Sequence, residues 1–305
     1  MSKQSGSRPV VLITGCSEPG SLGAATSREF LGRGFRVFAT ARRLSTLNEL
    51  EGSGCDVLSL DVTDADSIAK AKAEVIRLTG GRLDFLVNNA GVIDSSPLLE
   101  VDLDGLRAQY EINLFGPLRM IQAFTPLLAN SAIHGGTESV ILNVGTAASR
   151  LGVPFQGGYD SSKAALQTLS DVLRREMKNL GVHVMTLELA LVNTTATSNM
   201  DHSALNIRSA EAQQSSAYYP NFPEIVRANR EMFRKEVAKA PTVRDTAKYI
   251  VDAMTATSPK PKFWLGQNYW LAKYVWELLP ISTGDNMMSK MLGADKVVKP
   301  GLVDL

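Results

Sequence analysis

The strongest constraint on the fold is a regular alternation of short apolar runs with segments of helical period. Continuous apolar runs predict strands that are buried on both faces. Strands that alternate with helices predict a parallel sheet with right-handed crossovers, so we expect an α/β protein with a doubly wound parallel sheet. The expected strands are 10–14, 36–40, 57–61, 85–91, 139–145 and 183–189, and the expected helices are 24–34, 64–79, 102–129 and 158–180.

The pattern changes after Thr194, where a long polar segment rich in Ser, Thr, Asn and Ala begins. A loop of this length in a compact domain usually carries function. The chain is expected to form one sheet domain, residues 1–266, followed by an aromatic-rich helical extension, residues 267–305. The elements expected after Thr194 are helices near 223–239, 243–257, 268–279 and 285–292 and a strand at 262–266.

Composition and charge exclude several classes of function. The 305 residues carry 32 Lys and Arg against 31 Asp and Glu, without a run of like charges that would track nucleic acid. Two cysteines are too few for a disulfide framework, and three separated histidines lack metal-ligand spacing, so we expect a reducing compartment and no metal. The polar N-terminus predicts neither a signal peptide nor a membrane span, which indicates a cytoplasmic protein.

A glycine-rich loop, Thr14 to Gly23, lies between the first expected strand and the first expected helix. Gly15, Gly20 and Gly23 let the backbone turn tightly and approach a pyrophosphate, whose charge is favoured at a helix N-terminus. A purely structural turn would need similar residues, but this position favours a dinucleotide, with Leu22 at the start of the helix beside it. The sheet is therefore expected to be of the Rossmann type.

The end of the second expected strand indicates which dinucleotide binds. An NAD site usually carries an acidic residue there, whereas this chain has Arg42 and Arg43. Guanidinium groups suit a 2′-phosphate, which favours NADPH; the alternative is that both arginines only solvate the following helix. Asp61, at the end of the third strand, would then face the adenine, and Val62 would supply a backbone contact.

Tyr159 and Lys163 are the first candidates for catalysis. Their spacing within the helix expected over 158–180 puts the phenol and the ammonium on one face. A tyrosine hydroxyl has a pKa of about 10, so proton transfer at neutral pH requires a neighbouring positive charge that stabilises the phenolate. The pair therefore predicts acid–base chemistry, with Lys163 lowering the pKa of the tyrosine.

Two further polar residues fit the same chemistry. Thr146 follows a buried strand, thirteen residues before Tyr159, and its hydroxyl can hydrogen-bond a substrate carbonyl. Asn113 lies in the preceding helix, where it can bind a water that links Lys163 to bulk solvent. The alternative for Asn113 is an ordinary amide that kinks its helix.

Taken together, these motifs resemble the short-chain dehydrogenase/reductase family over about residues 9–266. The resemblance implies that Asn113, Thr146, Tyr159 and Lys163 form a catalytic tetrad, with Tyr159 as the proton donor and acceptor. It also implies that Lys163 holds the cofactor ribose, and that residues 1–266 are an NADP-binding catalytic domain.

The resemblance adds further residues to the cofactor site. It implies that Asn88 and Asn89 steady the central sheet and touch the adenosine ribose, and that Val192 and Thr194 lie where the nicotinamide carboxamide binds. The complete expected cofactor-binding set is Gly15, Gly20, Leu22, Gly23, Arg42, Arg43, Asp61, Val62, Asn88, Asn89, Tyr159, Lys163, Val192 and Thr194.

Three departures separate the chain from the family's usual pattern. The glycine loop is longer than usual and contains Pro19, which changes the expected geometry around a pyrophosphate. Thr146 stands where the family has serine, and Ser149 is the fallback candidate. Leu189-Ala190 replaces the family's Pro-Gly after the sixth strand, which leaves the turn at that place open.

The Cys-Ser after Gly15, the Gly-Ala-Asp-Lys at 293–296 and the helical extension make the chain similar to a fungal branch of acyl-dihydroxyacetone-phosphate reductases and secondary-metabolite reductases. This resemblance implies NADPH-dependent reduction of a ketone to a secondary alcohol on an apolar, lipid-like or polyketide-like molecule. Specificity would reside in residues 195–240 and in the C-terminal helices. The alternatives are NADP-dependent oxidation of an alcohol and a non-catalytic dinucleotide sensor, which the intact Tyr159 and Lys163 disfavour.

The extension itself allows three interpretations. Its expected helix at 268–279, which holds Trp270 and Trp276, is too short to cross a bilayer. It can lie on a membrane interface, cap an apolar substrate or pack against a second subunit. The family resemblance implies a homo-oligomer. Peripheral attachment to a lipid droplet or the endoplasmic reticulum therefore stays open beside free cytoplasmic location.

Overall fold

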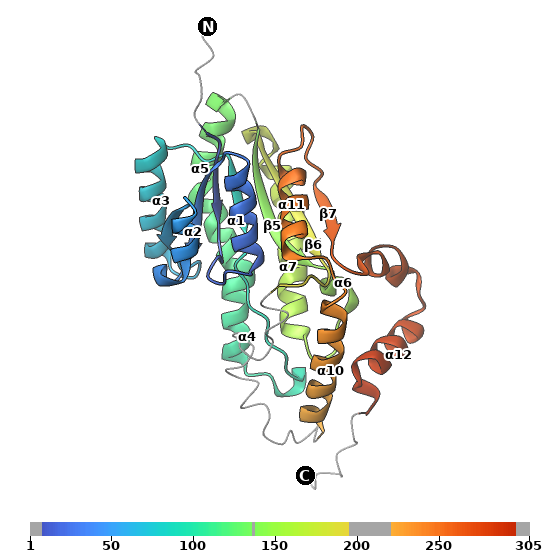
Figure 1. Ribbon diagram of the computed structural model, residues 1–305. Coiled ribbons are helices and arrows are strands. Elements are labelled where there is room, and N and C mark those ends of the chain that lie inside the picture. Colours follow the sequence, from blue (N-terminus) through green and yellow to red (C-terminus); the bar gives the residue numbers. More distant parts are fainter. Residues whose placement is uncertain (1–7, 136–137, 195–220, 297–305) are drawn as a thin grey trace.

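The computed structural model describes residues 8–135, 138–194 and 221–296, and its centre is a seven-stranded sheet (Figure 1). The strand order is β3-β2-β1-β4-β5-β6-β7, and every neighbouring pair is parallel. The α/β, doubly wound sheet of the Rossmann type is therefore confirmed. The strands are β1 Val10–Ile13, β2 Arg36–Ala41, β3 Asp56–Ser59, β4 Phe85–Asn88, β5 Ser139–Thr146, β6 Val182–Leu189 and β7 Lys262–Leu265.

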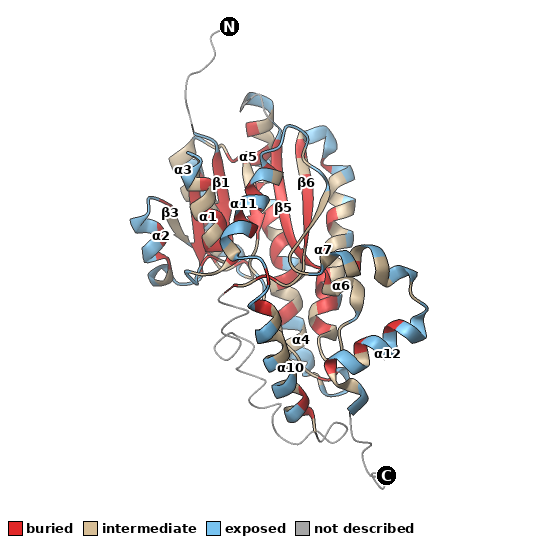
Figure 2. Ribbon diagram, turned by 45° about the vertical axis from the view of Figure 1, so that its right-hand side comes forward, coloured by how far each residue is buried: buried red, intermediate tan, exposed pale blue. Residues whose placement is uncertain are grey.

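Helices cover both faces of the sheet, and the strands between them are mostly buried (Figure 2). One apolar core lies under α1 and α11, and the other lies under α3 and α5. Two separate cores are what a doubly wound sheet requires, because each face buries its own layer of side chains. The helices are α1 Leu22–Gly32, α2 Asn48–Gly52, α3 Ala65–Thr79, α4 Leu103–Tyr110, α5 Gly116–Gly135, α6 Ala148–Leu151, α7 Gly157–Glu176, α10 Phe222–Val237, α11 Val243–Met254 and α12 Ile281–Leu292.

The single helix expected over 102–129 is interrupted. Helix α4 ends at Tyr110, a π-helical turn spans Glu111–Phe115, and α5 continues to Gly135. Apolar periodicity does not reveal such a turn, since one extra residue in a single turn barely disturbs the buried stripe. The interruption matters because it contains Asn113.

The single helix expected over 268–279 is also wrong in detail. A π-helical turn, Leu271–Val275, is followed by a 3-10 turn, Trp276–Leu278. In these turns each backbone hydrogen bond reaches one residue more or one residue fewer along the chain than in an α-helix. The side-chain pattern of so short a segment does not reveal this difference. The second helix, α12, begins at Ile281, four residues before the expected start.

The described part of the extension contacts the rest of the chain through α10 and α6. The amide of Asn229 donates to the Leu292 carbonyl at 2.9 Å, and the amide of Asn221 donates to the Lys296 carbonyl at 2.6 Å. Arg150 of α6 forms an ion pair with Glu277. The extension is thus attached at Glu277 and near the C-terminal end of its described length. None of the described helices has the length and apolar character needed to cross a membrane.

Candidate active site

The glycine loop is fastened to the end of β4. The amide of Asn89 donates to the carbonyls of Thr14 and Gly15 at 2.8 and 3.0 Å, and the Thr14 hydroxyl accepts from the backbone amides of Asn89 and Ala90, both at 3.0 Å. Gly15 has a φ of +75°, and a Cβ there would lie 2.8 Å from the Ala90 Cα. A Cβ on Gly23 would lie 2.6 Å from the Gly15 carbonyl oxygen. Side chains at these two positions would therefore displace the loop.

Helix α1 begins directly after this loop. Ser21 is its N-cap, and the Ser21 hydroxyl accepts from the Ala24 amide at 3.2 Å. Gly20 lies in the turn before the cap, and Leu22 is the first, buried residue of the helix. The partial positive charge of a helix N-terminus thus faces the loop that the sequence assigns to a pyrophosphate.

Two basic residues follow β2 at the same edge of the sheet. Arg42 and Arg43 are exposed, and neither forms an ion pair with a residue that the structure describes. Both guanidinium groups can therefore approach an anion. Across the β2–β3 pair, Asp61 accepts from the Thr63 backbone amide and hydroxyl at 2.9 and 2.7 Å, while Val62 is buried against Gly116. The Asp61 carboxylate therefore stabilises the turn that follows β3.

The Asn88 side chain is buried and forms its hydrogen bond within the sheet. Its amide donates to the Asn143 side-chain oxygen at 2.8 Å, and the Asn143 amide donates to the Ser170 hydroxyl of α7 at 2.8 Å. This chain of buried side chains joins β4, β5 and α7. Asn88 therefore braces the sheet beneath the site, whereas Asn89 holds the glycine loop.

Tyr159 and Lys163 lie on α7 where it passes the carboxyl end of β5. The Lys163 ammonium is buried, donates to the Val144 carbonyl at 2.8 Å and lies 6.0 Å from the centre of the Tyr159 ring. Burial raises the pKa of Tyr159 to about 12, although the Thr146 hydroxyl opposes the change, so the lowering of this pKa expected from Lys163 is not found. Burial lowers the pKa of Lys163 to about 8, and the charge of Glu188 opposes that shift.

Thr146 ends β5 beside this pair. Its hydroxyl donates to the Leu189 carbonyl at 3.2 Å and accepts from the Ala148 amide at 3.3 Å, and it lies close enough to the Tyr159 hydroxyl to influence the pKa of the tyrosine. Ser149 instead donates to the Thr146 carbonyl at 2.7 Å and stabilises the turn into α6. The Thr146 hydroxyl therefore lies beside Tyr159, whereas the Ser149 hydroxyl is used in the turn.

Asn113 is fully buried in the π-helical turn. Its side-chain oxygen accepts from the Val92 amide at 2.9 Å, and its amide donates to the Val92 carbonyl at 2.8 Å and to the Ser162 hydroxyl at 3.1 Å. Both amide hydrogens are thus used in joining the segment after β4 to α7. The expected water relay to Lys163 stays a prediction, and such a water can use only an acceptor position of Asn113.

The chain does not turn away from the sheet at Leu189-Ala190. It stays paired with the end of β7 and with Gln267 beyond it: the Ala190 amide donates to the Leu265 carbonyl and the Gln267 amide to the Leu191 carbonyl, both at 2.8 Å. Val192 and Thr194 are buried at the end of this segment. Most of the expected substrate segment, residues 195–220, lies outside the described residues.

Two acidic residues near the site were missed by the sequence analysis. Asp160 accepts from the Val153 backbone amide at 2.8 Å, and burial raises its pKa to about 7. Glu188 is fully buried in β6, and burial raises its pKa to about 7 as well. The sequence did hold a signal for Glu188: it is a charged residue within an apolar run, and a strand that is buried on both faces rarely contains a charged residue.

Within residues 8–135, 138–194 and 221–296, no three His, Cys, Asp or Glu side chains gather in a way that could hold a metal ion. The expectation of a site without metal rests on the sequence argument alone and stays a prediction.

Comparison with known proteins identifies the family. A family model described as short chain dehydrogenase matches residues 9–204. The NADPH-dependent 1-acyldihydroxyacetone phosphate reductase of Schizosaccharomyces pombe is 35% identical over 227 residues, which cover 74% of this chain and 73% of the relative. The short-chain dehydrogenase ptmH of Penicillium ochrochloron is 42% identical over 188 residues, which cover 61% of this chain and 67% of the relative.

A solved structure supports the fold independently. A short-chain dehydrogenase from Streptomyces avermitilis superposes with a TM-score of 0.69 at 24% identity, covering 96% of this chain and 98% of that one. With the family model and the fungal relatives, the conclusion is that this chain belongs to the short-chain dehydrogenase/reductase family.

Proposed function

We propose that this protein uses NADPH to reduce a ketone to a secondary alcohol. The observation that carries the proposal is the meeting of Tyr159, Thr146 and Lys163 at the carboxyl end of β5. Carbonyl reduction needs a hydroxyl that donates a proton, a second hydroxyl that holds the carbonyl oxygen, and a positive charge that stabilises the resulting phenolate. NADPH, when bound, supplies the hydride.

The residues present fit this cofactor. Because Gly15 has no side chain, the loop can pack closely against Ala90, and a pyrophosphate could bind at the N-terminus of α1. Arg42 and Arg43 are exposed and can bind a 2′-phosphate. On this proposal Asp61, Val62 and Asn89 line the adenosine side, with Asn88 bracing the sheet below. Gly20, Leu22 and Gly23 shape the loop, and Val192 and Thr194 lie toward the nicotinamide.

Each member of the tetrad has a separate task in this proposal. Tyr159 is protonated at neutral pH, so its hydroxyl can give a proton to the carbonyl oxygen. Thr146 orients that oxygen, and the ammonium of Lys163 holds the cofactor ribose and stabilises the phenolate once the proton has left. Asn113 positions the helix that carries both Tyr159 and Lys163, through Ser162.

The substrate class is proposed from the fungal relatives. One of them is named as an NADPH-dependent 1-acyldihydroxyacetone phosphate reductase, and ptmH is named only as a short-chain dehydrogenase. We infer an apolar ketone, lipid-like or polyketide-like. The same residues perform the reverse oxidation, and the cellular excess of NADPH over NADP favours reduction.

The first experiment is a panel of ketones assayed with NADPH and with NADH. The panel holds long-chain ketones, an acyl-dihydroxyacetone phosphate and aromatic polyketide ketones, and the matching alcohols are assayed with NADP. We expect NADPH-dependent turnover on one chemical class, followed by the loss of NADPH absorbance. Binding of NADPH without turnover on any ketone or alcohol would favour the sensor interpretation instead.

We further propose that the extension touches a lipid surface, so that the protein is cytoplasmic with a peripheral attachment. The support is the exposure of several apolar side chains in the extension, including Tyr274, Leu278 and Ile281; the last two are 82% and 83% exposed. We also propose that the protein forms a homo-oligomer, on the family resemblance alone. The division into a catalytic domain, residues 1–266, and an extension, residues 267–305, is likewise a proposal.

Charged substitutions test the lipid contact. The double variant Leu278→Glu/Ile281→Glu is expected to reduce sedimentation with phospholipid vesicles by about tenfold or more, because two apolar side chains no longer insert. Point variants are preferable to deletion after Gly266, since Gln267 pairs with Leu191. Ile133→Glu, at a 71% exposed position of α5, is the matched control. Unchanged sedimentation of the double variant would eliminate the lipid contact.

A further inference from the structure

Thr146 and Tyr159 are joined by a short connection whose backbone is strained at one residue. The connection runs through α6 and the loop 152–156 into the first turn of α7. Phe155 has a φ of +67°, and in the part of the chain that the structure describes only one other non-glycine residue, Asn268, has a left-handed backbone. Asparagine tolerates this conformation, whereas a bulky residue such as phenylalanine rarely adopts it. Contacts from outside Phe155 must therefore hold the loop in this shape.

These contacts come from three parts of the chain. The buried carboxylate of Asp160 on α7 accepts from the Val153 backbone amide at 2.8 Å. In the segment after β4, the Ser96 backbone amide donates to the Phe155 carbonyl at 2.8 Å. On α10, the Phe222 ring lies 5.0 Å from the Phe155 ring, centre to centre, at an angle of 59°. Since Phe222 is buried near the start of α10, the ring contact requires α10 to be in place.

Helix α10 is in turn held by the C-terminal extension. The side-chain amide of Asn229 donates to the Leu292 carbonyl at the end of α12, at 2.9 Å. The next residue, Gly293, ends α12 in the left-handed conformation, and a Cβ there would lie 3.7 Å from a methyl group of Ile225. Phe222 and Ile225 are three residues apart on α10, so they are neighbours on its surface, and both are buried. The end of α12 therefore contacts α10 beside the ring that meets the loop.

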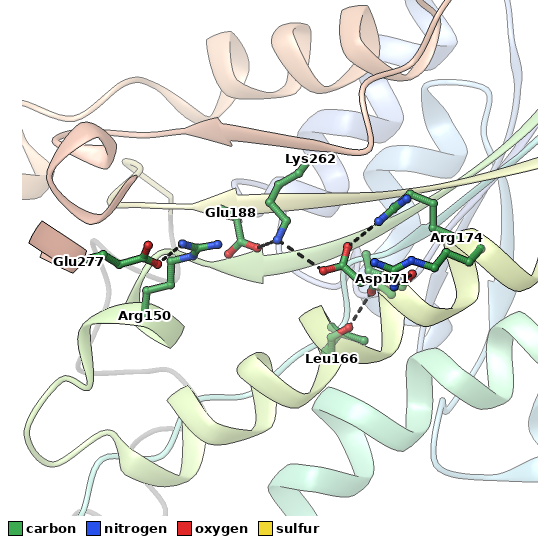
Figure 3. A network of polar contacts seen from close by, with 10 residues as sticks. Arg150, Leu166, Asp171, Arg174, Glu188, Lys262 and Glu277 are labelled. Carbon is green, nitrogen blue, oxygen red and sulfur yellow. Dashed lines mark hydrogen bonds and ion pairs between the residues drawn. The ribbon is translucent and has the colours of Figure 1, made fainter. Parts of the chain in front are cut away.

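The extension also reaches the connection at α6. Arg150 of α6 forms an ion pair with Glu277 in the 3-10 turn before α12, and Figure 3 shows the two side chains pointing toward one another. The Arg150 guanidinium also lies over the ring of Trp264 in β7, 5.3 Å from its centre. The extension thus contacts the connection directly at α6 and, through α10, at Phe155.

We propose that the C-terminal extension is a positioning element of the active site: through Arg150 and through α10 it keeps Phe155 in its left-handed conformation, and so fixes Thr146 relative to Tyr159. This inference rests on the proposed function only where it concerns catalysis. Two hydroxyls that act on one carbonyl oxygen must be placed accurately, because a misplacement of about 1 Å can lower a rate by about 100-fold. A strained connection needs outside contacts to reach this accuracy.

Hydrogen exchange tests the structural link in the full-length protein without cofactor or substrate. Because an exposed ion pair contributes little alone, the variant Gly293→Val/Glu277→Gln weakens both attachments at once. Valine is strained at the left-handed end of α12, and glutamine removes the charge that pairs with Arg150. We expect amides in the peptide 150–160 to exchange about tenfold faster, as measured by mass spectrometry. Unchanged exchange there, with faster exchange in α12, would overturn the proposal.

The matched control makes the same two changes on α3. Gly80 ends α3 with a φ of +68°, against +72° for Gly293, and Glu74 of α3 pairs with Arg77. Gly80→Val/Glu74→Gln is therefore expected to loosen the end of α3 and to leave the exchange of the peptide 150–160 unchanged. Equal acceleration of this peptide in both variants would show general destabilisation and would contradict the proposal.

A second variant covers the case in which the extension stays in place. Phe222→Leu keeps an apolar side chain at this buried position and removes the ring that contacts Phe155. It should accelerate exchange in the peptide 150–160 whatever the state of α12. Without such acceleration, α10 would not hold the loop, and the proposal would fail.

Catalysis supplies a separate readout. For ketone reduction, Gly293→Val/Glu277→Gln should lower kcat by about tenfold and change the KM for NADPH by less than about threefold, because the two hydroxyls shift and the glycine loop does not. Partial unfolding would instead lower kcat and the number of NADPH sites together, and an unchanged kcat would overturn the catalytic part of the proposal. If the wild-type protein reduces no carbonyl, the proposed function fails, whereas the exchange experiments still decide the role of the extension.

Discussion

Replacement of Tyr159 by phenylalanine is expected to lower kcat for ketone reduction by about three orders of magnitude, or about 4 kcal/mol in the activation barrier. Phenylalanine keeps the ring that lies over Lys163 and removes only the hydroxyl, so the fold and the affinity for NADPH should be kept. The carbonyl oxygen would then lack a proton donor, although Thr146 could still hold it. Steady-state turnover, with NADPH binding measured by fluorescence quenching, checks both halves of this expectation.

The control is the same substitution at a remote, exposed tyrosine. Tyr249 lies on α11, which covers the sheet face opposite α7, and it is 59% exposed. Tyr249→Phe is therefore expected to leave kcat and NADPH affinity unchanged. If Tyr159→Phe kept turnover within about tenfold of the parent, a general acid other than this tyrosine would have to be found.

The sheet was predictable because its strands bury both faces. Runs such as Val10–Ile13 are apolar throughout, so their place in a central parallel sheet follows from the sequence alone. Strand ends were less certain: the run expected to reach residue 91 stops at Asn88. The backbone amides that follow bond to the Thr14 hydroxyl instead of a neighbouring strand. Such a local competition between hydrogen-bond partners is invisible in an apolar pattern.

The site was predictable where spacing fixes geometry, and not where the tertiary fold does. Tyr159 and Lys163 meet because helix geometry brings residues four apart onto one face. The surroundings of Asn113 depend on a π-helical turn, and the place of Glu188 depends on the register of β5 against β6. Neither the π-helical turn nor the strand register can be predicted from the local pattern of apolar residues. A charged residue inside an apolar run was the one available hint of the buried acid in β6.

The C-terminal extension shows the same limit. Residues 268–279 were expected to form one helix, but the two turns between Leu271 and Leu278 are of other types, and Glu277 within them forms an ion pair with Arg150. That contact joins residues 127 positions apart in the chain. Short segments with few buried side chains take their conformation from such distant contacts, because intrinsic helix formation over so few residues is weak.

Removing the positive charge after β2 is expected to change cofactor preference. In Arg42→Ala/Arg43→Ala, the KM for NADPH should rise about 30- to 100-fold, as expected for the loss of about 2–3 kcal/mol of charge-assisted contact with a 2′-phosphate. The KM for NADH should change by less than about threefold, since NADH has no such phosphate. Initial rates at varied concentrations of each cofactor give the ratio directly.

The control must separate local recognition from net charge. Arg77→Ala removes a cation from α3 whose side chain is 66% exposed and paired with Glu74, so both KM values should stay as they are. Recognition by guanidinium groups also predicts that Arg42→Lys/Arg43→Lys recovers only part of the preference, because an ammonium keeps the charge but loses the forked geometry. If the double alanine variant kept its preference for NADPH, these arginines would only solvate the start of the next helix, and the 2′-phosphate would have to be bound elsewhere.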